Sequence, residues 1–271
     1  MGGGNVIAGT HDDVDARLTR DARQRLGLTA DAGHGGIHHG SAARTTEAQD
    51  LLLLRFIILK LQVVLQSIGV AGELTEGAHG VRAGVIGEIG ISELFNDAER
   101  RVLRASAIAH KKTGAGVLVH INPWTENGRE SCEILLSAGV PADRIAISHI
   151  DVENHEDYVL WMLKQGVYVE FDNFGKEYFV EKEARHDGYG CFVTDVERVL
   201  FLKKLIEMGY VNQILASCDV CLKTCLRTYG AWGYDHVLAN VVPMMQEFGI
   251  SDADIDTILR KNPADFLCGK E

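Results

Sequence analysis

From Glu73 onward, short apolar runs alternate with stretches in which apolar residues recur at helical spacing. The apolar runs predict strands within 81–90, 116–120, 144–149, 166–172 and 213–219. The first of them, 81–90, has the composition of a strand buried on both faces. Because the connections between strands and helices are short, this order predicts a parallel α/β sheet. A closed barrel and an open doubly wound sheet are both compatible with it.

Capping residues indicate where several of the helices begin. Asn96 and Thr194 each stand three residues before a glutamate, which is the pattern of a capping box. The helices are expected over 97–112, 129–138, 155–165, 195–208 and 251–260. We expect Pro243 to kink the helix that contains it, and Asn262-Pro263-Ala264 to terminate the last helix.

The first 72 residues do not follow this pattern, so we divide the chain into a divergent or disordered region, 1–72, and a folded region, 73–271. Within the first region, Leu51–Val70 is strongly apolar, but Arg55 and Lys60 interrupt it. Each central cation would cost about 2.5–3.5 kcal/mol in a membrane span. The segment therefore predicts a buried or interface helix rather than a membrane span, and it leaves a homodimer open.

Composition narrows the classes of partner. A net charge of -11 and a pI near 5.5 disfavour general binding to nucleic acid or to anionic membranes, so a small-molecule substrate is expected. No nucleotide-binding glycine loop follows any predicted strand. Six cysteines without a signal-peptide pattern indicate reduced thiols and a cytoplasmic protein. The spacing of Cys218, Cys221 and Cys225 matches neither a zinc ribbon nor a common iron–sulfur motif, so these residues are expected to be ordinary thiols.

Four predicted strands end in side chains that bind metals: Glu88, His120, His149 and Asp219. In a barrel the carboxyl ends of all strands meet at one face, which would bring the four residues together. Two imidazoles and two carboxylates suit zinc, manganese or iron. Each residue also has a structural interpretation when taken alone, as a hydrogen-bonded histidine or as a carboxylate paired with a buried arginine.

Seven motifs resemble, in order and spacing, the phosphotriesterase family of the amidohydrolase superfamily, and more closely its phosphotriesterase-related branch. They are Gly-Val-Ile-Gly-Glu-Ile-Gly at 84–90, Val-His at 119–120, Ser-His-Ile-Asp at 148–151, Glu-Phe-Asp-Asn-Phe-Gly at 170–175, Ser-Cys-Asp-Val-Cys-Leu-Lys at 217–223, Gly-Tyr-Asp-His-Val-Leu at 233–238 and Asn-Pro-Ala at 262–264.

This resemblance implies a (β/α)8 TIM barrel with a binuclear zinc site. Glu88 would bridge the two metals, His120 and His149 would bind the more exposed one, and Asp219 would bind the more buried one and accept a proton. The implied reaction is hydrolysis, in which a metal-activated hydroxide attacks an ester, a lactone or an amide, with phosphotriester as the family's label. The residues expected to contact the substrate are Asp172, Trp232 and Tyr234.

One family feature is absent from the predicted strands. The family's first strand ends in His-x-His, which completes the buried metal site, and no predicted strand here carries this motif. We therefore expect a barrel that lacks its first strand and binds at most one zinc ion firmly. The alternative to a hydrolase is a catalytically impaired or non-catalytic binding protein on a truncated barrel.

Overall fold

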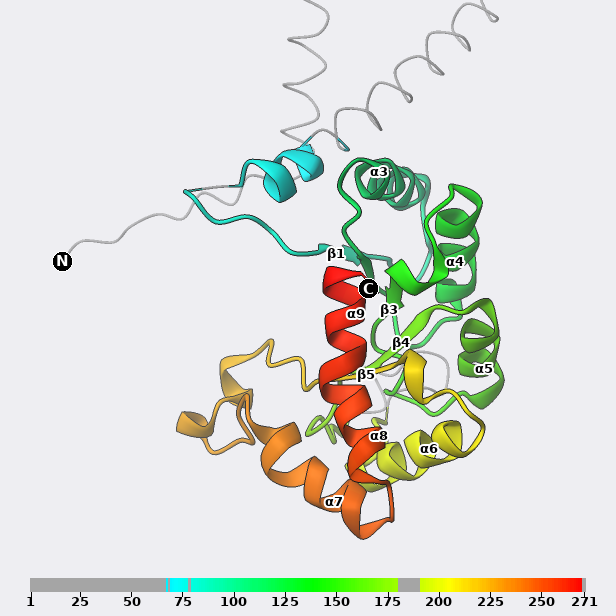
Figure 1. Ribbon diagram of the computed structural model, residues 1–271. Helices are drawn as coiled ribbons and strands as arrows, with labels where there is room; N and C mark the ends of the chain where they lie inside the picture. The colour runs from blue at the N-terminus through cyan, green and yellow to red at the C-terminus, as the bar shows by residue number, and fades with distance from the viewer. Residues whose placement is uncertain (1–66, 68, 78, 180–190, 270–271) are drawn as a thin grey trace, which may run out of the picture. The chain divides into compact units, whose positions relative to one another are not determined.

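The computed structural model describes residues 67, 69–77, 79–179 and 191–269 (Figure 1). The chain divides into two compact units, 1–53 and 54–271, and every described residue belongs to the second. The predicted region 1–72 and the apolar segment Leu51–Val70 therefore lie almost wholly outside the described residues. Within the range 1–72, the structure describes residues 67 and 69–72, which are helical. Among the described residues, no helix is long and apolar enough to cross a membrane.

Five parallel strands form one sheet in sequential order, which confirms the predicted parallel α/β organisation. Helices α3 to α6 follow the strands in turn and lie along the outside of the sheet in Figure 1. Each strand is shorter than its apolar run, because pairing ends where the chain turns toward the next helix. The elements are β1 (Ile86–Gly90), α3 (Asp97–Thr113), β2 (Val117–His120), α4 (Asn127–Ser137), β3 (Ile145–Ile147), α5 (Glu156–Gln165), β4 (Tyr168–Phe171), α6 (Asp195–Glu207) and β5 (Ile214–Ala216).

Both predicted capping boxes are present. The Asn96 side chain accepts hydrogen bonds from the first turn of α3, and the Thr194 hydroxyl accepts one from the first turn of α6. In each helix the glutamate at the third position bonds back to the cap, which satisfies main-chain N–H groups that the helix leaves free. Gly114 ends α3 in the left-handed conformation that glycine adopts without strain.

The core has two layers because successive strand residues point to opposite faces. Val117, Val119 and Ile147 are fully buried in the larger cluster, which includes residues of α3, α4 and α5. On the other face, Tyr168 packs edge-on against Phe266 with ring centroids 5.7 Å apart. The centre of the sheet is therefore buried on both faces.

The prediction that 81–90 is buried on both faces is wrong. Within β1 only Ile86 is buried, and Val81, which precedes the strand, is 73% exposed. The reason is the strand's place in the sheet: among the described residues β1 lies at the edge and pairs only with β2. Its apolar composition therefore does not lead to burial on both sides.

The prediction that Asn262-Pro263-Ala264 ends the last helix is also wrong. A π-helical segment, Val237–Val241, leads into α7 (Val242–Glu247), and a second one, Thr257–Lys261, joins α8 (Asp252–Asp256) to α9 (Asn262–Cys268). The main-chain N–H of Asn262 bonds to the Thr257 carbonyl, five residues back. Pro263 follows this wider turn directly. Because proline has no main-chain N–H group, it donates no helical hydrogen bond, and at the start of α9 none is required of it. The chain therefore remains helical to Cys268.

Candidate metal centre

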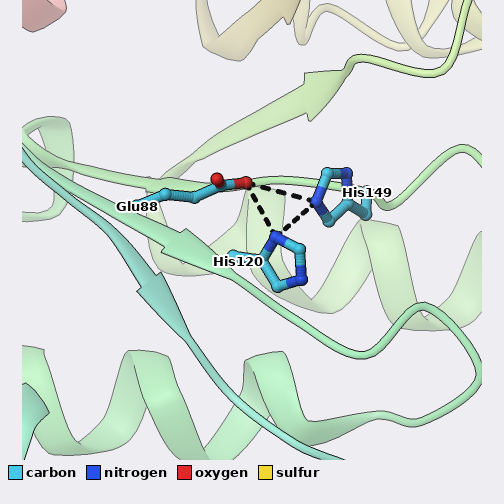
Figure 2. Close-up of side chains that lie close together, drawn as sticks. All are labelled: Glu88, His120 and His149. Carbon is cyan, nitrogen blue, oxygen red and sulfur yellow. Dashed lines mark hydrogen bonds and ion pairs between the residues drawn. The ribbon is translucent and has the colours of Figure 1, made fainter. Parts of the chain in front are cut away.

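Three of the four predicted metal ligands converge at the carboxyl ends of neighbouring strands (Figure 2). Glu88 lies in β1, His120 ends β2, and His149 follows β3 by two residues. His120 Nδ1 lies 2.7 Å from Glu88 Oε1 and 2.8 Å from His149 Nε2, and His149 Nε2 lies 3.4 Å from the same Glu88 oxygen. The parallel order of the strands places the three side chains side by side.

This donor set fits a zinc ion. Zinc binds imidazole nitrogen and carboxylate oxygen at about 2.0–2.2 Å, so the ligands of a tetrahedral site lie about 3.3 Å apart. The separations of 2.7, 2.8 and 3.4 Å are close to that spacing. The side chains of Glu88 and His120 remain 49% and 43% exposed, which leaves the site open to a small molecule. Catalytic zinc sites characteristically combine three protein ligands with one open position.

His149 is oriented by a buried carboxylate behind it. Its main-chain N–H and its Nδ1–H both donate to Asp172, and the second bond leaves Nε2 directed at Glu88 and His120. Burial lowers the pKa of His149, but the hydrogen bond and charge of Asp172, with the charges of Asp219 and Glu88, outweigh it and raise the pKa to about 9. The backbone of His149 has a φ of 59°, an uncommon conformation for a residue other than glycine.

Asp172 therefore does not lie where a substrate contact was predicted. It is 3% exposed, and its carboxylate also accepts from the side-chain amide of Asn173. Its position behind His149 is that of a carboxylate that orients a metal ligand. Of the other two predicted substrate contacts, Trp232 is partly buried against Gly175, whereas Tyr234 is 75% exposed.

Asp219 is not a member of the three-residue group. Its carboxylate is instead paired with the ammonium group of Lys176, a residue that sequence reasoning did not select. Lys176 is 4% exposed. Burial lowers the pKa of Lys176, but the hydrogen bond and charge of Asp219 outweigh this and raise it, so Lys176 is a cation. Asp219, like His149, has a positive φ, here 31°.

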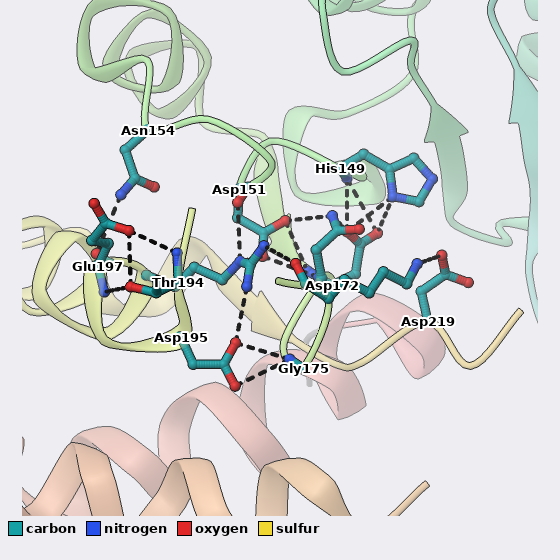
Figure 3. Close-up of polar contacts among 12 residues, drawn as sticks. His149, Asp151, Asn154, Asp172, Gly175, Thr194, Asp195, Glu197 and Asp219 are labelled. Atoms are coloured by element: carbon teal, nitrogen blue, oxygen red, sulfur yellow. Dashed lines mark hydrogen bonds and ion pairs between the residues drawn. The ribbon is translucent and has the colours of Figure 1, made fainter. Parts of the chain in front are cut away.

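A fully buried arginine in α6, Arg198, contacts the loops that follow β3 and β4. Figure 3 shows Asp151, Gly175 and Asp195, which belong to the same polar network. Arg198 donates from Nε to the Asp151 main chain and from Nη1 to Asp195, at 3.1 and 2.9 Å. Its Nη2 donates to the Lys176 carbonyl at 3.0 Å, and Asp195 also accepts from the Gly175 N–H. This network fixes the loops that follow β3 and β4. Nothing in the sequence marks Arg198, which sits in an ordinary helical pattern.

A cavity of about 200 Å³ adjoins His149 on the side of the loops that follow β2 and β3. Two carboxylates, Glu126 and Glu153, are part of its wall, and His155 Nε2 bonds to Glu153 at 2.6 Å. The remaining wall is formed by Pro123, Trp124, Thr125, Ile150 and Tyr158. A small molecule could therefore lie against the open side of His149.

The clustered cysteines form no metal site within the described part of the chain, where the only candidate group is Glu88, His120 and His149. Cys218 and Cys225 are buried and Cys221 is exposed, and all three are free thiols. Cys225 Sγ instead lies 3.3 Å from the Tyr178 hydroxyl.

Comparison with known proteins identifies the family. A sequence profile described as "Phosphotriesterase family" matches residues 64–267, which is most of the chain. The chain belongs to the phosphotriesterase family. Members of this family are TIM barrels, and the five parallel strands described here are part of that α/β fold.

Curated relatives include proteins named N-acetyltaurine hydrolase. The chain is 32% identical to the phosphotriesterase homology protein of Escherichia coli (strain K12), over 72% of this chain and 63% of that protein. It is 36% identical to N-acetyltaurine hydrolase of Dictyostelium discoideum, over 69% of this chain and 50% of that protein. The N-acetyltaurine hydrolase of Danio rerio is 31% identical over 99% of this chain and 74% of its own length. The chain thus spans less than two thirds of the first two relatives.

Solved structures show the same family. The Escherichia coli phosphotriesterase homology protein, complexed with phosphate in its active site, is similar with a TM-score of 0.67 and 31% identity. That match covers 76% of this chain and 67% of the other. A resiniferatoxin-binding protein from Rhodobacter sphaeroides gives a TM-score of 0.69 at 27% identity, covering 74% and 56% of the two chains.

Proposed function

We propose that this protein is a zinc-dependent hydrolase that cleaves a small amide whose amine part carries an anionic group, the class to which N-acetyltaurine belongs. The observation that carries the proposal is the convergence of Glu88, His120 and His149 donor atoms at one point. The relatives named N-acetyltaurine hydrolase support an amide in preference to the ester, lactone or phosphotriester that the sequence also allowed. The six free thiols support action in the reducing cytoplasm.

Glu88, His120 and His149 would hold the zinc ion, which when bound supplies a Lewis acid that polarises a carbonyl and lowers the pKa of water. The residues of the chain then have separate tasks. Asp172 holds the His149 ring in place. Asp219 accepts the proton of the attacking water and returns it to the leaving nitrogen, so that one water yields an acid and an amine. Tyr234, exposed after β5, remains a proposed substrate contact.

A non-catalytic binding protein is the second candidate, and one observation favours it. Asp219 forms an ion pair with Lys176 and is not a member of the three-residue group. Among the described residues, therefore, only three possible metal ligands lie together. A second metal ion does not fit these residues. A site of this kind is nevertheless sufficient for hydrolysis, because single-zinc hydrolases use three protein ligands.

The test is an assay of the full chain with added zinc against panels of N-acyl amino acids, N-acetyltaurine, esters and lactones. We expect amide cleavage that falls about 10²–10⁴-fold in Asp219→Asn, the usual contribution of a group that moves protons. Asp157→Asn, an exposed carboxylate at the start of α5, is the matched control and should retain full activity. Hydrolysis that Asp219→Asn leaves unchanged would refute the mechanism, and no turnover of any substrate would favour the binding protein.

A further inference from the structure

We propose that Lys176 binds the anionic group of the substrate, a sulfonate or another oxyanion of that kind, and so selects anionic over neutral substrates. This inference rests on the proposed function, because it names the residue that would recognise the charged end of the proposed amide. It assigns Lys176 a specificity role in addition to its pairing with Asp219.

The first argument is the number of donors on a buried ammonium group. Lysine carries three N–H donors and no acceptor. Within the described part of the chain, the Lys176 ammonium group donates to Asp219, and the Lys176 side chain is only 6% exposed. A buried donor without a partner is costly, because it loses its hydrogen bonds to water and gains none in return. The spare N–H groups of Lys176 are therefore suited to an oxyanion that arrives with the substrate.

The second argument is that the two buried arginines already have hydrogen-bond acceptors. The Arg198 guanidinium donates to Asp151, Asp195 and the Lys176 carbonyl. Arg144 donates to the main-chain carbonyls of Gly114 and Asp265, in the loop after α3 and in α9. Among the buried lysine and arginine side chains of the described residues, Lys176 is thus the one that follows a strand at its carboxyl end and has N–H groups beyond the one that pairs with Asp219.

The third argument comes from the cavity beside His149. Glu126 and Glu153 in its wall would repel an anion, and the imidazole of His155 is bonded to Glu153. An anionic group would therefore be placed away from this cavity, whereas an uncharged acyl group suits it. Lys176, which is not part of the cavity wall, offers the opposite charge.

The fourth argument is that the main chain of Lys176 is fixed before any ligand arrives. Its carbonyl accepts from Arg198 at 3.0 Å, and the preceding N–H, that of Gly175, donates to Asp195 at 2.8 Å. Because the loop is already ordered, binding an anion there costs little conformational entropy. A lysine on a free loop would lack this advantage.

The experiment measures binding of inorganic phosphate to the zinc-loaded full chain by titration calorimetry. Lys176→Gln, which removes the charge and keeps a polar group, should weaken phosphate binding about 10- to 100-fold, the loss expected for one charge-assisted hydrogen bond. Lys204→Gln is the matched control, since Lys204 pairs with Glu156 on the surface, and it should bind phosphate as the unaltered protein does. In kinetics, Lys176→Gln should raise KM for N-acetyltaurine and leave KM for a neutral lactone unchanged.

Equal phosphate affinity in Lys176→Gln and the unaltered protein would overturn the proposal, and so would an equal loss of activity toward anionic and neutral substrates. If Lys176→Gln does not fold, a crystal structure of the unaltered protein with phosphate decides the matter. A phosphate oxygen within hydrogen-bond distance of Lys176 Nζ is the expected result, and phosphate bound elsewhere refutes the proposal. The calorimetry needs no turnover, so a failure of the proposed function would be visible separately as absent hydrolysis.

Discussion

Asp172 accepts hydrogen bonds from both the main-chain N–H and the imidazole Nδ1–H of His149, each 3.0 Å from the same carboxylate oxygen. Two bonds to one residue fix the position of the backbone as well as the orientation of the ring. With the proton on Nδ1, Nε2 would be the atom available to a metal, and Nε2 is the atom that faces Glu88 and His120. The orientation of the His149 ring therefore depends on a buried residue outside the three-residue group.

The first prediction follows from this pair. Asp172→Asn keeps the size of the side chain but removes its negative charge and replaces one acceptor oxygen by an NH2 donor. The side chain can then donate to His149 Nδ1 as well as accept from it, so His149 should lose its preferred tautomer. We expect zinc affinity to fall about 10- to 100-fold, the usual effect of changing a group that orients a metal ligand. Competition with a coloured zinc chelator measures the change. Asp157→Asn serves as the control, and an affinity equal in both variants would show that Asp172 has no such role.

The second prediction concerns the stability that zinc provides. A ligand that binds only the folded protein stabilises it by about 2.7 kcal/mol at a concentration of 100 times its Kd. Zinc should therefore raise the unfolding temperature of the chelator-treated protein, and His120→Ala should abolish most of that rise because one of three ligands is lost. His155→Ala is the matched control, since that imidazole lies outside the group. A zinc-dependent shift that persists in His120→Ala would contradict the proposed ligand set.

The sequence predicted the structure best where a residue's place in the chain alone determines its place in the fold. In a parallel sheet the residues that end successive strands lie side by side, so the proximity of Glu88, His120 and His149 followed from their positions alone. Capping boxes at Asn96 and Thr194 were equally local and equally predictable.

The residues that the sequence did not single out are defined by their tertiary contacts. Lys176 and Arg198 are buried cations that pair with Asp219 and Asp151 in other loops, and helical spacing does not distinguish them from surface residues. The prediction that the helix ends at Pro263 failed because the rule behind it assumes α-helical hydrogen bonding. The π segment before Pro263 has a different hydrogen-bond pattern. The burial of β1 was overestimated because composition does not reveal which strand lies at an edge.

The third prediction tests the network beneath the site. Arg198→Met should lower the free energy of unfolding by about 3–5 kcal/mol, because it leaves the fully buried carboxylate of Asp151 without its counter-ion and removes one of the two ion-pair partners of Asp195. Arg260→Met is the matched control, since Arg260 pairs with Asp256 on an exposed helical surface, and it should change stability little. Urea unfolding measures both. Similar midpoints for the two variants would mean that the buried network adds no more stability than a surface pair.

The fourth prediction separates a backbone effect from a packing effect at Gly175. Its φ of 88° disfavours any other residue, and a Cβ there would meet the Trp232 ring at 2.6 Å. Gly209 has a similar φ of 92° but nothing within 4 Å of its Cβ position, so Gly209→Ala carries the backbone cost alone, about 1 kcal/mol. Gly175→Ala should cost a further 1–3 kcal/mol, roughly the penalty for overpacking. Urea unfolding of both variants gives the difference, and equal losses would show that Trp232 moves away freely.

Because Gly175 precedes Lys176, a larger loss in Gly175→Ala should be accompanied by weaker phosphate binding, which Gly209→Ala should leave intact.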